Sequence, residues 1–119
     1  MTDQRPTVFL RGNDFRRTYD EKVLPFEQIR KKLRQFMHTK RENPQQSFGA
    51  SDKHFVSAGP YAGLRHAHLT QDLSVVYNVI NKTVFLYGFY THQDLGTGNP
   101  PKFGNQKTMS TKFKNTKFG

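Results

Sequence analysis

Four of the five histidines in this chain fall between positions 54 and 92, and their spacing suits proton-transfer chemistry. In the run RHAH, His66 and His68 are two residues apart. On a β-strand this spacing places both side chains on one face, while Arg65 and Ala67 point to the other. The sequence therefore predicts a pair of histidines on one surface of a sheet.

Further candidate groups lie where the expected strands begin and end. Asp72 follows His68 by four residues, at the turn into the next apolar run, and His92 closes the last apolar run. His54 lies in the loop before the sheet. Cleavage of RNA without a metal ion needs one group that takes the proton of the ribose 2′-hydroxyl and another that protonates the leaving 5′-oxygen. Histidine suits both roles because its pKa lies near neutrality.

The same residues leave two other interpretations open. A histidine in a strand is commonly a structural residue, and His66 and His68 could instead bind zinc together with His92 or Asp72. Spacing alone does not separate a metal site from an acid–base site. Because the surroundings are basic, they disfavour a divalent cation, and we expect neither a metal ion nor another cofactor.

The composition points to a small basic protein. The chain has 119 residues, enough for one domain, and 19 Lys and Arg against nine Asp and Glu give a net charge of +10. Such an excess favours a polyanionic partner, although solubility alone would also explain it. The absence of cysteine excludes disulfides, thiolate metal sites and cysteine nucleophiles.

The hydrophobic pattern indicates a cytoplasmic protein with no membrane partner. No segment approaches the roughly 20 apolar residues that a membrane span needs. The first ten residues, MTDQRPTVFL, lack the long apolar core of a signal peptide.

The periodicity predicts an α+β fold with two N-terminal helices packed on a small antiparallel sheet. The runs LSVVYNVI and TVFLYGFYT are apolar at nearly every position, which favours a central hairpin covered on one face by the helices. The expected elements are a strand at 7–10, a helix that Pro25 ends, a helix at 26–41, and strands at 63–69, 73–80 and 83–91.

The composition changes after position 96, so we expect a domain at 1–96 and a flexible basic tail at 97–119. The tail has five lysines and no acidic residue, and its three phenylalanines are far apart. It lacks the apolar residues to fold alone. The alternatives are an RNA-binding arm whose phenylalanines stack on bases, a segment that folds back over the sheet, and an extension without a role.

These residues resemble a known family. The segment KHFVSAGPYAGLRHAHLTQDLSVVYNV, followed by VFLYGFYTH, resembles the RelE/ParE toxin superfamily and, within it, the YafQ-like branch of mRNA interferases. The matching features are a histidine before a short loop, an Arg-x-x-His strand, an aspartate four residues later, a strand containing tyrosine and a final strand that ends in Thr-His. They correspond here to His54, Arg65 and His68, Asp72, Tyr77 and His92.

The resemblance implies a RelE-like fold and a toxin that cuts messenger RNA on the ribosome and is neutralised by a cognate antitoxin. It implies that His54, His68, Asp72 and His92 line the cleavage site. His92 would be the general acid, and Asp72 or His68 the base. Arg65 would bind phosphate or hold the site in place.

The chain departs from this family at some positions. Gly88 stands where the branch usually has an arginine, four residues before the last histidine, and Leu73 replaces a common aromatic residue. Lys53, Lys102 or another tail lysine would then have to supply the cation that stabilises the phosphate.

Two other functions stay open. Gly88 would suit a weakened enzyme or a module that only binds RNA or the ribosome. A ParE-like toxin that acts on a protein such as gyrase is the third possibility, although that branch does not need the histidines.

Overall fold

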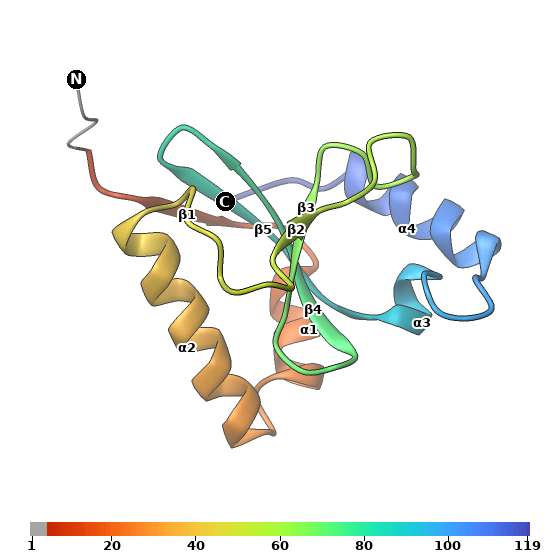
Figure 1. The fold of residues 1–119 in the computed structure, drawn as a ribbon, viewed down its shortest axis with the longest axis horizontal. Helices are drawn as coiled ribbons and strands as arrows, with labels where there is room; N and C mark the ends of the chain where they lie inside the picture. Colours follow the sequence, from red (N-terminus) through yellow and green to blue (C-terminus); the bar gives the residue numbers. More distant parts are fainter. Residues whose placement is uncertain (1–4) are drawn as a thin grey trace.

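The computed structural model describes residues 5–119, which form a mixed five-stranded sheet with helices on both faces (Figure 1). The strand order is β1-β5-β4-β3-β2. The elements in chain order are β1 (Val8–Arg11), α1 (Phe15–Lys22), α2 (Glu27–Glu42), β2 (Lys53–His54), β3 (Arg65–His68), β4 (Leu73–Ile80), β5 (Thr83–Thr91), α3 (His92–Leu95) and α4 (Phe103–Lys114).

The predicted α+β class is confirmed, and the expected elements occur in the expected order, while β2, α3 and α4 were not predicted. The strands expected at 73–80 and 83–91 have those bounds, and Asn81 takes a positive φ of 55° in the short turn between them. The expectation of a purely antiparallel sheet is wrong, because β1 pairs with β5 in parallel. The chain passes through both helices and three strands between these partners, and local sequence patterns carry no signal for the direction of so distant a pairing.

The two N-terminal helices cover one face of the sheet, as predicted. Phe36 and Leu33 of α2 and Val23 after α1 pack with alternate strand residues such as Val75 and Phe89. Burial of such side chains stabilises the fold by about 1.5–3 kcal/mol each. This core fixes the sheet on which the histidines lie.

The opposite face carries a second core, and the C-terminal segment covers it. Phe113 of α4 is buried, and its ring meets those of Tyr61, Tyr87 and Tyr90 with centroids 5.3–5.6 Å apart. Further along, the ring of Phe118 packs on Tyr87. This second cover explains why β4 and β5 are apolar on both faces.

The structure does not bear out the flexible tail. Residues 103–114 are helical, and the last residue pairs with β1 through two backbone hydrogen bonds between Arg11 and Gly119. The segment folds back over the sheet, which was one of the alternatives, because Phe113 and Phe118 meet the tyrosines that β5 supplies. The boundary at residue 96 stays a prediction, although residues on both sides of it share the second core.

A buried ion pair ties α2 to the strand region. The Lys40 ammonium lies 2.7 Å from the Asp52 carboxylate, and both side chains are fully buried. Burial opposes ionisation of Asp52, but hydrogen bonds from Lys40, the Tyr77 hydroxyl and the Phe48 N–H lower its pKa below the usual range.

Within residues 5–119, none of the helices has the length and apolar character that crossing a membrane requires.

Candidate active site

The ends of three strands bring His68, Asp72 and His92 together. His68 ends β3 opposite Ser74, and the turn that follows returns the chain into β4. In that turn the Thr70 hydroxyl accepts hydrogen bonds from the N–H groups of Asp72 and Leu73. Leu73 also pairs with the last residue of β5, so His92, the next residue, lies beside Asp72.

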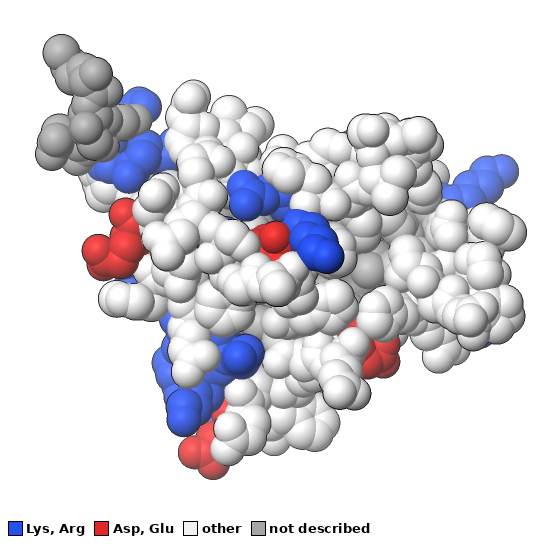
Figure 2. Space-filling model, in the orientation of Figure 1, with Lys and Arg blue, Asp and Glu red and all other residues white. Residues whose placement is uncertain are grey.

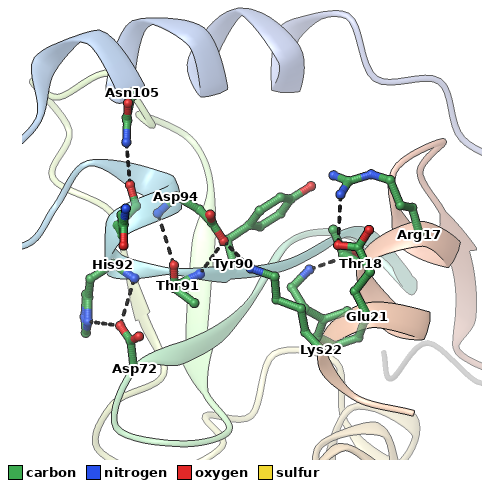
Figure 3. A network of polar contacts seen from close by, with 12 residues as sticks. Arg17, Thr18, Glu21, Lys22, Asp72, Tyr90, Thr91, His92, Asp94 and Asn105 are labelled. Atoms are coloured by element: carbon green, nitrogen blue, oxygen red, sulfur yellow. Dashed lines mark hydrogen bonds and ion pairs between the residues drawn. The ribbon is translucent and has the colours of Figure 1, made fainter. Parts of the chain in front are cut away.

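The three side chains form a continuous polar chain. Asp72 Oδ1 lies 2.9 Å from His92 Nδ1 and also accepts the backbone N–H of His92 at 3.0 Å (Figure 3). His92 Nε2 lies 3.4 Å from His68 Nε2. Because a carboxylate accepts a proton donor best, Nδ1 of His92 carries a proton toward Asp72, and Nε2 of His92 faces Nε2 of His68.

The short helix α3 holds the backbone of His92 in place. Thr91 and Asp94 form a capping box, in which the Thr91 hydroxyl accepts the Asp94 N–H and the Asp94 carboxylate accepts the Thr91 N–H (Figure 3). Lys22 of α1 binds the same carboxylate at 2.7 Å, and Asn105 of α4 donates to the Gln93 carbonyl at 2.7 Å. This support was not predicted, although the spacing Thr-x-x-Asp is a recognisable capping signal.

His66 extends the row of rings away from His92. Its ring lies 5.6 Å from the ring of His68 and stacks on Phe55 at 4.3 Å, measured between centroids. Burial lowers the pKa of His66, and the nearby charges of His68, His92 and Lys53 act in the same direction. His66 therefore favours the neutral form. The prediction that His66 and His68 share a face is confirmed by their ring contact.

Two predicted site residues lie on the other face of the sheet. His54 on β2 pairs with Arg65 on β3, and such cross-strand neighbours point to the same face. Arg65 is buried, with its guanidinium 5.2 Å from the Tyr77 ring centroid, among the groups around Asp52. The structure thus does not bring His54 or Arg65 to His68 and His92.

The two predicted lysines lie nearer to the histidines. Lys53 pairs with His66 across β2 and β3, so it shares the histidine face. Lys102 precedes α4 and lines a cavity of about 210 Å³ together with His92. Both lysines are exposed, so their ammonium groups can reach an anion at this surface.

Gly88 has no room for the arginine that the resemblance would place there. A Cβ at this position would lie 2.7 Å from the Tyr90 hydroxyl and 2.8 Å from the Thr18 hydroxyl. Those groups belong to a polar cluster in which Tyr90 donates to Asp14. The cation for a phosphate must therefore come from another element.

Across the described residues, 5–119, no three His, Cys, Asp or Glu side chains are arranged to hold a metal ion. The three-ligand arrangements that the spacing of the histidines allowed are therefore not formed in that part of the chain.

A basic surface lies over α2, as Figure 2 shows for the face drawn there. The helix carries four exposed basic side chains, Lys31, Lys32, Arg34 and Arg41, and the half-buried Arg30. A polyanion would be attracted to this surface in a salt-dependent way.

Comparison with solved structures identifies the fold. No protein-family model matches the sequence, and no curated protein matches it. A copper-bound mutant toxin from Helicobacter pylori superposes with a TM-score of 0.62 at 21% identity, over 75% of this chain and 98% of that one. YafQ in the E. coli DinJ-YafQ toxin-antitoxin complex gives 0.60 at 18% identity, over 75% and 96%. The YoeB/ParE toxin from Agrobacterium tumefaciens gives 0.60 at 12% identity, over 72% and 99%. The expected likeness to the RelE/ParE superfamily is therefore confirmed for the fold.

Proposed function

We propose that this protein is the toxin of a toxin–antitoxin pair and that it cleaves messenger RNA without a metal ion. The observation that carries the proposal is the chain from Asp72 through His92 to His68, with contacts of 2.9 and 3.4 Å, at strand ends where Asp72 and His92 are exposed to solvent. The shared fold of YafQ and YoeB/ParE toxins supports it.

In the proposed reaction the ribose 2′-oxygen attacks the neighbouring phosphorus while the bond to the 5′-oxygen breaks. His68 accepts the proton of the 2′-hydroxyl, and His92 donates a proton from Nε2 to the leaving oxygen. The products are a 2′,3′-cyclic phosphate and a free 5′-hydroxyl. Asp72 keeps the His92 ring oriented and stabilises its protonated form, rather than acting as the base.

The proposed partners are supported by other features of the molecule. The exposed basic side chains of α2 suit RNA, and we propose that messenger RNA is cut on the ribosome in the cytoplasm. The solved DinJ-YafQ complex supports a cognate antitoxin as the protein partner.

Induced expression with mapping of RNA ends tests this function. We expect His92→Ala or His68→Ala to lower cleavage by about 10²–10⁴-fold and to relieve growth inhibition, because each removes a proton-transfer group. His38→Ala is the matched control, since His38 is exposed on α2, and His54→Ala should also keep activity. Undiminished cleavage by both site variants would contradict the proposal.

A module that binds RNA without cutting it is the second candidate. The filled space at Gly88 favours it, because no cation can be placed there on β5. It would give strongly salt-dependent RNA binding, unchanged by His92→Ala, and no cleaved ends in the wild type.

A further inference from the structure

A cavity of about 210 Å³ lies on the side of His92 that faces the loop of residues 96–102. His92 and Lys102 both line it, with Gly98, Asn99 and Pro100 between them. A group bound there would contact the histidine and a cation at once.

The loop is tied closely to His92. The Thr97 N–H donates to the His92 carbonyl at 3.0 Å, and the Lys102 N–H donates to the Gly96 carbonyl at 3.0 Å. Gly96 takes a left-handed φ of 68°, and a Cβ there would lie 2.2 Å from the Lys102 carbonyl oxygen. Only glycine fits at position 96, and this close approach places the backbone of Lys102 beside α3.

Helix α4 also binds the Gly96 carbonyl. Gln106 donates from its side-chain amide to the Gly96 carbonyl at 2.8 Å. Together with the contact of Asn105 on Gln93, this bond fixes the start of α4 against α3. The position of Lys102 is thus set by contacts that involve none of its own side-chain atoms.

The charge of Lys102 is not neutralised within the described residues. Lys22 pairs with Asp94 and Lys112 with Asp14, but no carboxylate of residues 5–119 forms an ion pair with Lys102. A cation that faces a cavity next to a histidine and has no carboxylate partner suits an anionic ligand.

We propose that the loop of residues 96–102 is a phosphate subsite in which the Lys102 ammonium holds a non-bridging oxygen of the scissile phosphate. This inference rests on the proposed function and assigns part of the active site to the C-terminal segment. Lys102 then supplies the charge stabilisation that position 88, filled by Tyr90 and Thr18, does not.

Binding of product-like phosphates to the full chain tests the subsite. The four nucleoside 3′-monophosphates and inorganic phosphate are titrated while the NMR signals of the His92 ring are followed. We expect Lys102→Ala to raise the Kd of the nucleotides by roughly tenfold or more, because a charge-assisted hydrogen bond is lost. Lys102→Arg keeps the cation and should stay within about threefold of the wild type.

Lys114→Ala is the matched control, because it removes the same charge at the far end of α4. Equal weakening by Lys102→Ala and Lys114→Ala would show a general charge effect and overturn the subsite, as would unchanged binding by Lys102→Ala. The titration needs no turnover, so it separates the two proposals. Undiminished cleavage by His92→Ala and His68→Ala would refute the proposed function, whereas normal phosphate binding by Lys102→Ala would refute the subsite alone.

Discussion

Replacement of Asp72 by asparagine isolates the electrostatic part of the proposed site. Asparagine keeps an oxygen that can accept the N–H and Nδ1–H of His92, both of which Asp72 Oδ1 accepts at 2.9–3.0 Å. The substitution therefore leaves the geometry nearly intact and removes one negative charge. We expect the cleavage rate to fall while the fold is retained.

The distance and the exposure set the size of this effect. At 2.9 Å, the attraction between the carboxylate and a protonated His92 is about 1.4 kcal/mol for an effective dielectric constant near 80 and about 2.9 kcal/mol near 40. These high dielectric constants apply because the His92 and Asp72 side chains are 43% and 64% exposed. Since each ~1.4 kcal/mol is a factor of ten in rate, cleavage should fall roughly 10- to 100-fold. The free energy of unfolding should change by less than about 1 kcal/mol, as for other exposed pairs.

Single-turnover cleavage measured beside a urea melt checks both numbers. Asp20→Asn is the matched control, because it removes the same charge from an exposed pair with Arg16 on α1, away from the site. Cleavage by Asp72→Asn at the wild-type rate would refute the role of Asp72. An equal loss in Asp20→Asn would show that net charge, not the contact with His92, is responsible.

Three further changes test the surroundings of the site. His66→Phe should flatten the pH dependence of the free energy of unfolding below about pH 6.5. Because the pKa of folded His66 is lowered, only the unfolded chain gains that proton, so the stability of the wild type falls as the pH falls. Urea melts at several pH values check this, and the same pH dependence in the variant and the wild type would contradict it. Lys40→Met should cost about 3–5 kcal/mol in a thermal melt, because it leaves the buried Asp52 carboxylate unpaired, and a loss below 1 kcal/mol would contradict this. Gly88→Arg should lower stability by at least about 1–3 kcal/mol without raising cleavage, because its Cβ would overlap the Tyr90 hydroxyl; a more active, equally stable variant would disprove the overlap.

Local patterns were sufficient for most of the elements. The strands at 73–80 and 83–91 are long runs of β-branched and aromatic residues, and the helix predicted at 26–41 lies at Glu27–Glu42. Such patterns depend on residues close together in the sequence, so they predict the type of an element but not the elements that it packs against. The parallel pairing of β1 with β5 joins residues about 75 positions apart, and it was not predicted. The packing of the C-terminal segment on the sheet was only one of three alternatives, because it depends on side chains from several strands.

The candidate site shows the same division. The grouping of His68, Asp72 and His92 was implied by the resemblance, and the structure forms it at the ends of antiparallel strands. The resemblance placed His54 and Arg65 beside them, but alternation along β3 turns Arg65 to the opposite face, and the register of the two-residue strand β2 pairs His54 with it there. A register shift of one residue reverses every side chain of a strand, and so short a strand has no pattern that fixes it.

The sequence by itself determined which positions of the strands carry histidine and which of these histidines share a face. Alternation is a property of the extended backbone itself, so it was enough to place His66 and His68 on one face. Only the tertiary structure brought Asp72 within 2.9 Å of His92, filled the space at Gly88 and laid residues 97–119 against the sheet. These outcomes depend on packing between distant segments, because the volume left by one side chain decides what another segment can occupy.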